Sequence, residues 1–174
     1  MRFLLPLVAF LTFAACGGGS STTTPTASGP TQSPSCEDAT PGGSLQSIAF
    51  PRGTGLNEPV LVVEVADNAA ERATGLMNRP CLAPNGGMIF AWHTDTTAGF
   101  WMEDTQVPLS IAFIQADGRI VHIEDMQPET TNNHTSPEPY RYAIEANRGW
   151  FAASGVSEGG LADIPGSLTE HATN

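Results

Sequence analysis

Residues 99–114, GFWMEDTQVPLSIAFI, are the stretch on which the interpretation of the whole chain depends. Residues 110–114 are mostly apolar and prone to form strands, so they predict a well-buried β-strand. Residues 100–102 predict a second short strand, and residues 103–105 form a polar corner between the two. A buried tryptophan brings a large apolar area and one N–H that needs a partner. We therefore expect Trp101 to belong to the core and the corner to be structural.

The start of the chain has the features of an export signal. Arg2 supplies a positive charge, and the apolar run at residues 3–13 is too short to span a bilayer. The small residues directly before Cys16 resemble a bacterial lipobox, in which the cysteine is lipidated and becomes the mature N-terminus. We predict that residues 1–15 are a signal peptide and that lipid on Cys16 anchors the protein to the extracytoplasmic side of the bacterial cell envelope. Ordinary secretory cleavage is the alternative.

A flexible tether is predicted to follow the anchor. Residues 17–35 consist of Gly, Ser, Thr and Pro apart from one Ala and one Gln, a composition that cannot build a core. Random-coil scaling gives this segment a mean reach of about 25 Å. The predicted organisation is thus a lipidated cysteine and linker at 16–43, one folded domain at 44–165 and a tail at 166–174.

The charge balance excludes a basic nucleic-acid-binding surface. The chain has 7 basic residues, all of them arginine, against 18 acidic residues. Loss of Arg2 with the signal peptide leaves a formal net charge of 6 − 18 = −12. We therefore expect no nucleic-acid partner, and we expect contact with the membrane through the lipid anchor rather than through anionic headgroups. The small-molecule or protein partner is left open by composition.

Cys36 and Cys81 remain as a pair once Cys16 is assigned to lipid. In an exported, oxidising compartment an even pair predicts a disulfide, which would pin the start of the folded region to its body. Two free thiols are the alternative. A two-cysteine metal site without close spacing is a weak signal.

The folded region predicts many short strands and few helices. A helix is expected at 69–77, with Asn68 as its N-cap and Glu71 in a capping-box position. A helical turn is expected at 149–154, and the part after Gly159 lacks periodicity and is expected to fray. The predicted fold is mostly β, a sandwich or barrel with antiparallel or mixed strands and one or two short helices. The predicted strands are 45–50, 60–65, 88–92, 110–114, 119–126 and 142–146, with a hairpin turn at 116–118 and a long polar loop at 127–139.

An ordered series of motifs over residues 60–155 resembles the DUF192 family. The series is ERATGLM at 71–77, GMIF at 87–90, FWMEDTQVPLSIAFI at 100–114, DGRIV at 117–121, YAIE at 142–145 and GW at 149–150. The resemblance implies a compact, mostly-β domain, in a family whose biochemical role is unassigned. The family usually has Asn where this chain has Asp104 and a basic residue where it has Glu103. Its closing turn and strand are only partly matched at 159–163.

No complete catalytic or metal-binding motif occurs in the sequence. His122 and Glu124 lie on one strand face and raise the question of a metal, but an exposed polar face explains them equally well. The methionines lie in apolar runs and are better explained by packing than by copper. We therefore predict no metal and no cofactor. The three carboxylates Glu103, Asp104 and Glu145 could include a general acid–base pair.

The candidate ligand-binding set is centred on the corner that follows Phe100, and no catalytic residue is assigned. We expect one of the carboxylates at 103, 104 or 145 to meet Arg72 or Arg141, because a buried charge is tolerated when it is paired. The favoured function is a non-catalytic module of the cell envelope that binds a small ligand or a protein. The alternative is an enzyme of unrecognised type with its site at residues 101–105. A concave pocket at this corner would favour a ligand site. The set is Trp101, Met102, Asp104, Thr105, Arg72 and Glu145.

Overall fold

The computed structural model describes residue 36 and residues 44–53 and 57–170. The predicted signal peptide, the lipid attachment at Cys16 and nearly all of the predicted linker lie outside the described residues. None of the described helices is long and apolar enough to cross a membrane. The described elements are β1 (Leu45–Ala49), β2 (Val60–Ala66), α1 (Ala69–Thr74), β3 (Gly86–Thr96), β4 (Leu109–Ile114), β5 (Ile120–Met126), β6 (Tyr140–Asn147), α2 (Trp150–Ala153) and α3 (Gly166–Glu170).

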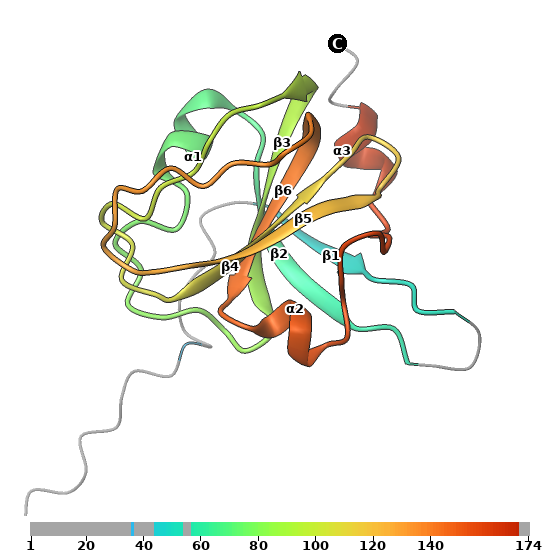
Figure 1. Cartoon of the computed structure of the whole chain (residues 1–174), viewed down its shortest axis with the longest axis horizontal. Coiled ribbons are helices and arrows are strands. Elements are labelled where there is room, and N and C mark those ends of the chain that lie inside the picture. The colour runs from blue at the N-terminus through green and yellow to red at the C-terminus, as the bar shows by residue number, and fades with distance from the viewer. Residues whose placement is uncertain (1–35, 37–43, 54–56, 171–174) are drawn as a thin grey trace, which may run out of the picture. The chain divides into compact units, whose positions relative to one another are not determined.

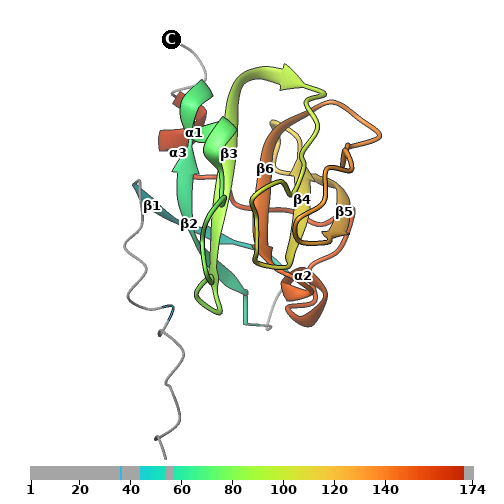
Figure 2. The same cartoon turned by 90° about the vertical axis from the view of Figure 1, so that its left-hand side faces the viewer.

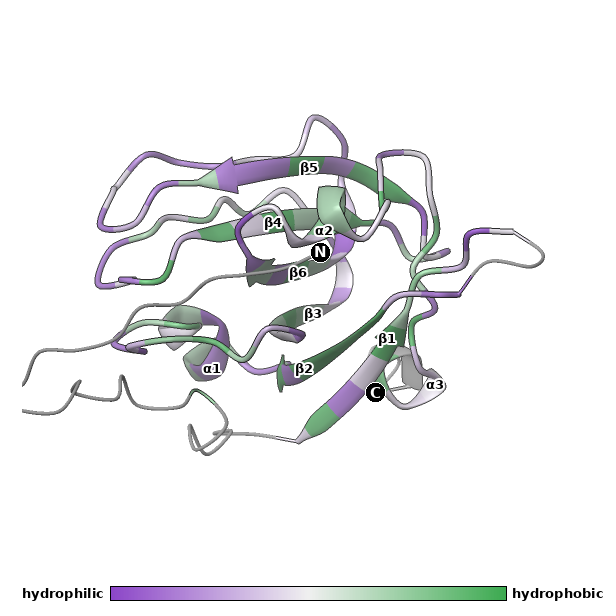
Figure 3. Ribbon diagram, turned by 90° about the horizontal axis from the view of Figure 1, so that it is seen from below, coloured by the Kyte–Doolittle hydropathy of each residue, from purple (hydrophilic) through white to green (hydrophobic). Residues whose placement is uncertain are grey.

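The strands form a single mixed sheet with the order β1-β2-β3-β6-β4-β5 (Figures 1 and 2). β2 and β3 run parallel, with α1 between them in the chain, and every other neighbouring pair is antiparallel. Figure 3 shows the sheet as an open curl with β5 and β1 at its two ends. The prediction of a mostly-β fold with mixed strands and short helices is confirmed, and the sheet is not closed into a barrel.

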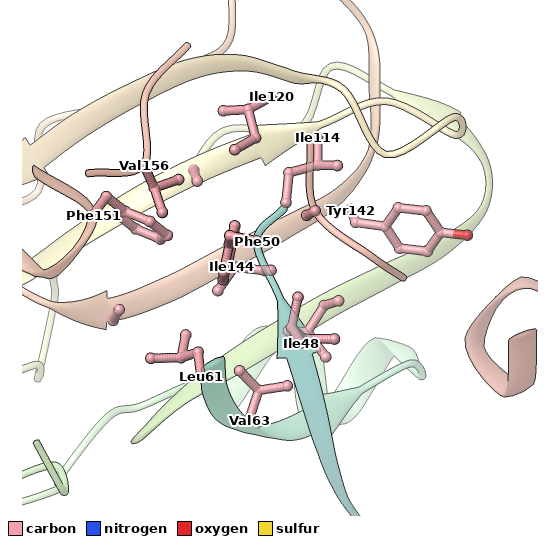
Figure 4. Close-up of a cluster of buried hydrophobic side chains, with 14 of the residues drawn as sticks. Ile48, Phe50, Leu61, Val63, Ile114, Ile120, Tyr142, Ile144, Phe151 and Val156 are labelled. Carbon is pink, nitrogen blue, oxygen red and sulfur yellow. The ribbon is translucent and has the colours of Figure 1, made fainter. Parts of the chain in front are cut away.

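Two hydrophobic clusters lie on opposite faces of this sheet, because side chains alternate along each strand. The inner cluster fills the curl and brings Ile48, Ile144 and Phe151 together (Figure 4). The outer cluster includes Phe90 and Ile111 and lies on the face toward α1. β4 contributes to both clusters, which explains why all six of its residues are buried, as the sequence predicts.

α1 begins at the predicted cap. The Asn68 side chain accepts hydrogen bonds from two backbone N–H groups of the first turn, at 3.1 and 3.0 Å, and the Glu71 carboxylate accepts from the N–H of Asp67 at 3.2 Å. The helix ends at Gly75, earlier than predicted, because this residue takes a φ of 48°. A Cβ at this position would also come within 3.3 Å of the Phe90 ring. The turn after α1 therefore lies close against the outer face of β3.

The predicted short strand at residues 100–102 is wrong. Within the described structure, its pairing with another strand is limited to one isolated bridge between Phe100 and His134. His134 lies in the loop 127–139. The N–H of Met102 donates to the carbonyl of Thr130, in the same loop, at 2.8 Å. The segment is thus fastened to the loop 127–139 instead of adding a strand to the sheet.

The corner also differs from the prediction in which side chains it buries. Trp101 is 54% exposed and is not a core residue, whereas its neighbour Met102 is fully buried. Asp104 takes a φ of 53°, a left-handed conformation that Asn and Asp tolerate better than most residues. The Asp104 carbonyl accepts a hydrogen bond from the N–H of Asn78 at 2.7 Å. Asp104 therefore shapes the backbone, while its side chain lies on the surface.

The last part of the domain is ordered rather than frayed. Leu161 forms a bridge with Arg119, which directly precedes β5, and Asp163 forms one with Ala49 at the end of β1. α3 follows, and its Leu168 is buried in the inner cluster. These contacts fasten the chain to both ends of the curled sheet, which sequence periodicity does not reveal.

The predicted disulfide is confirmed. Cys36 and Cys81 are bonded, with their Cα atoms 5.7 Å apart and a sequence separation of 45 positions. Cys81 lies in the connection between α1 and β3. The bond therefore joins the N-terminal boundary of the folded region to the connection that follows α1.

Candidate functional site

The predicted site residues surround a cavity of about 400 Å³ on the outer face of the sheet. α1 and the turn after it form one side, β3 and β6 form the floor, and the segment 98–105 forms the other side. The lining residues are Ala69, Arg72, Ala73, Thr74, Gly75, Leu76, Met77, Phe90, Trp92, Ala98, Gly99, Phe100, Trp101, Thr105 and Glu145. This volume lies within the range of cavities that hold small ligands.

Aromatic rings dominate the wall of the cavity. Phe100 packs edge-on against Phe90, with 5.0 Å between ring centroids, and against Trp92, at 6.2 Å. Trp92 also packs against Tyr140 at 5.4 Å. Because these rings hold one another, their positions are set before any ligand arrives. Trp101 lines the same cavity and is the exposed member of the wall.

Glu145 places a carboxyl group at the floor. It lies in β6 directly opposite Met88 of β3 and Ile111 of β4, which both belong to the outer apolar cluster. The residue is only 4% exposed, and no described residue donates a hydrogen bond to its carboxyl group. Burial raises the pKa of Glu145 from its ordinary 4.5 to about 8. The group is therefore mostly protonated at pH 7 when the cavity is empty.

Arg72 lines the cavity without pairing to a carboxylate. One of its terminal nitrogens donates to the backbone carbonyls of Asp67 and Ala91, at 2.5 and 2.8 Å, and its guanidinium lies 5.3 Å from the centre of the Trp92 ring. The expected pairing of Arg72 or Arg141 with a carboxylate at 103, 104 or 145 is wrong. Arg141 pairs instead with Asp95 at 2.8 Å.

The structure separates the six candidate residues into two groups. Arg72, Trp101, Thr105 and Glu145 line one cavity, although Arg72 and Glu145 are 73 positions apart in the chain. Met102 points into the outer core, and Asp104 is exposed and does not line the cavity. The remaining wall residues, Phe90, Trp92 and Phe100, were not predicted, because aromatic residues in a strand pattern indicate packing as readily as binding.

The other titratable clusters contain pairs of their own, although the buried Nε2 of His134 has no hydrogen-bond partner among the described residues. Arg79 makes two hydrogen bonds of 2.6 Å to Glu64, beside a smaller cavity of about 290 Å³ next to the disulfide. Glu124 contacts His134 at 2.9 Å and His122 at 3.9 Å. No group of three or more His, Cys, Asp or Glu side chains that could hold a metal was found among the described residues. The exposed side chains of residues 103 and 104 do not form an acid–base pair with Glu145 at the cavity.

These features define a single-sheet, mostly-β domain with a preformed aromatic cavity. The protein belongs to the DUF192 family, described as Uncharacterized ACR, whose model matches residues 53–164. The expectation drawn from its sequence motifs is thereby confirmed. A comparison with curated proteins found no match for this chain.

Solved structures that are similar to it include the following two. One is a protein from Sinorhizobium meliloti 1021, described as a candidate transcription regulator, with 32% identity and a TM-score of 0.66 over 70% of this chain and 94% of that one. The other is a protein of unknown function from Novosphingobium aromaticivorans DSM 12444. It has 28% identity and a TM-score of 0.65, over 84% of this chain and all of the other.

Proposed function

We propose that this protein is an exported, lipid-anchored module that binds a small molecule in the aromatic cavity between α1, β3 and residues 98–105. The observation that carries the proposal is Glu145. A carboxyl group that is 4% exposed and receives no hydrogen bond from a described residue is unusual, since burying a polar group without a partner costs free energy and buried polar groups are ordinarily paired. A ligand that supplies the missing partner explains why the group faces a cavity.

A binding role fits the lining better than catalysis does. Its ionisable side chains are Arg72 and Glu145, and its hydroxyl groups belong to Thr74 and Thr105. Each hydroxyl donates to a backbone carbonyl, so neither is placed next to a base as a nucleophile would be. The raised pKa of Glu145 favours one alternative, a general acid–base enzyme that uses this single carboxyl group.

Export and lipid anchoring are supported by separate features of the chain. The Cys36–Cys81 disulfide is typical of an oxidising compartment. The apolar start, the small residues before Cys16 and the uncharged linker support a lipid anchor and a spacer. Replacing Cys16 by Ser should abolish lipid labelling and release the protein from the membrane fraction. Membrane retention without processing of the signal peptide would contradict this part of the proposal.

A nucleic-acid partner is not part of the proposal, although one similar structure is described as a candidate transcription regulator. After loss of the signal peptide the chain has a formal net charge of 6 − 18 = −12. The described arginines are also engaged within the domain. Arg79, Arg119, Arg141 and Arg148 contact carboxylates, while Arg52 and Arg72 bind backbone carbonyls. A DNA backbone requires basic groups that this surface does not offer.

Native mass spectrometry of the protein purified from its own cell envelope tests the proposal. We expect an additional mass on the parent protein that is lost or strongly reduced in Trp101→Ala and in Glu145→Gln. Leu161→Ala is the matched control, because Leu161 is 50% exposed and does not line the cavity. A ligand retained equally by all variants would place binding elsewhere. Retained binding together with lost turnover of that ligand in Glu145→Gln would favour the enzyme.

A further inference from the structure

We propose that the ligand is an organic cation with a methylated ammonium group, held between the Glu145 carboxylate and the aromatic wall. This inference rests on the proposed function and specifies the chemical class of the ligand. Three features of the cavity carry it: an acidic group without a partner among the described residues, an aromatic surface in the same lining, and few side chains that could accept hydrogen bonds from N–H donors.

The acidic group stands out within its own row of the sheet. Strand register places Glu64, Met88, Glu145, Ile111 and Glu124 in one row across β2, β3, β6, β4 and β5. The outer two carboxylates have cationic or titratable partners, Arg79 at 2.6 Å and His134 at 2.9 Å. Glu145 is the most central acid of the row, and no described basic side chain reaches it. A cation in the cavity would give it the partner that its two counterparts have.

Arg72 is not the cationic partner of Glu145. It lines the same cavity, but its hydrogen bonds go to backbone carbonyls and its guanidinium lies over Trp92. Burial is the cause of the raised pKa at Glu145, with no counteracting contribution from a positive charge. The neighbours facing Glu145 from β3 and β4 are Met88 and Ile111, which carry no charge.

The wall beside Glu145 suits a methylated cation. Phe90 lies two residues from Met88 on the same face of β3, and Phe100 and Trp92 continue the aromatic surface from it. Aromatic faces attract quaternary ammonium groups through their negative quadrupole, most strongly where water is excluded. A primary ammonium presents three N–H donors, each of which needs an acceptor. A methylated ammonium needs only the charge of one carboxylate and apolar or aromatic contacts, which matches this lining.

Binding of such a cation is coupled to deprotonation of Glu145. Since burial raises the pKa of this group to about 8, the empty cavity holds a neutral acid at pH 7, and the cation favours the carboxylate. The bound proton must therefore leave to solvent as the ligand enters. Between about pH 6 and pH 8, affinity for a permanently charged cation should rise by about tenfold per pH unit, and it should level off above that range.

Choline and its neutral isostere 3,3-dimethylbutan-1-ol provide a matched pair of probes for the mature protein. We expect choline to bind at least roughly tenfold more tightly than the alcohol, because only choline carries the charge. Glu145→Gln should strongly reduce that preference, leaving only the part due to the aromatic wall, and Glu58→Gln, at an exposed glutamate, should keep it in full. Quenching of tryptophan fluorescence reports occupancy and should be reduced in Trp101→Phe, in which Trp92 is the remaining tryptophan of the cavity lining. Titration of the wild type in two buffers with different ionisation enthalpies should reveal proton release without any variant.

The outcomes separate the two levels of the proposal. Equal binding of both probes, unaffected by Glu145→Gln, would overturn the cation while leaving a ligand-binding cavity. Tighter binding of n-propylammonium than of choline would overturn the methylated class. Absence of proton release on choline binding would also overturn the inference. Failure of every probe, together with no retained ligand from the envelope, would overturn the proposed function as well.

Discussion

Replacing Glu145 by Gln should stabilise the ligand-free protein, and the gain should grow with pH. Glutamine has nearly the shape of protonated glutamic acid, so the substitution removes ionisation without opening a cavity. The parent residue is 4% exposed, and burial raises its pKa from an ordinary 4.5 to about 8. Ionisation of this carboxyl group therefore costs free energy in the folded state, whereas in the unfolded chain the group ionises at its ordinary pKa.

The sign and size of the effect follow from proton linkage. Between pH 4.5 and about 8 the folded state holds a proton that the unfolded chain releases, so the free energy of unfolding falls as pH rises. The stabilisation that comes from keeping Glu145 protonated in the folded state is complete below pH 4.5, and it is lost as pH rises through the folded pKa of about 8. A shift of this size corresponds to a loss of roughly 5 kcal/mol over the whole interval, and of roughly 3 kcal/mol by pH 7.

Urea unfolding with the disulfide intact measures the effect, at several pH values from about 4.5 to 9. The difference in unfolding free energy between Glu145→Gln and the parent should rise across this range, because contributions from the other acids cancel in the difference. Glu58→Gln, at an exposed position, controls for the loss of one negative charge. A difference curve for Glu145→Gln that stays flat would refute the assignment of Glu145 as a buried acid without a partner.

Three further substitutions and one chemical treatment test the packing. Trp101→Ala should lower the free energy of unfolding by less than about 1 kcal/mol, since this side chain is 54% exposed, whereas Trp150→Ala should cost about 3–5 kcal/mol in the same urea assay. Equal losses would contradict the placement of the two indoles. Gly87→Ala should lower the melting temperature sharply, because a Cβ there collides with a backbone carbonyl of β6 and with apolar side chains of β2; an unchanged melting temperature would argue against this register. Reducing the Cys36–Cys81 disulfide should cost roughly 3–4 kcal/mol, and peptide mapping without reductant should recover the linked pair. Two alkylatable thiols in the native protein would exclude the bond.

Much of the fold was determined locally by the sequence. Residues 110–114 and 60–65 formed strands where their β-branched and apolar content predicted them, and Asn68 capped α1 through a contact within its own turn. The hairpin between β4 and β5 likewise depends on a few adjacent residues. Such features are predictable because the groups that stabilise them are neighbours in the chain.

The corner and the C-terminal part were decided by tertiary contacts. Trp101 was expected in the core because tryptophan is large and apolar, yet residues 100–102 bond to the loop 127–139 instead of joining the sheet. That attachment buries Met102 and leaves the indole at the mouth of the cavity. The order of the last residues depends on bridges to Ala49 and Arg119, which no local periodicity encodes.

The candidate site shows the same division. Residue types alone were enough to single out Arg72, Trp101, Thr105 and Glu145 as candidates, but they also singled out Met102 and Asp104, which do not line the cavity. Spacing along the chain cannot state how far apart two side chains lie. The distance between α1 and β6, and the neutral surroundings that raise the pKa of Glu145, arise only when the strand order brings β6 beside β3. The sequence determined which chemical groups are present, whereas the arrangement of the sheet determined which of them meet, because a carboxyl group's partners and solvation are properties of its surroundings in space.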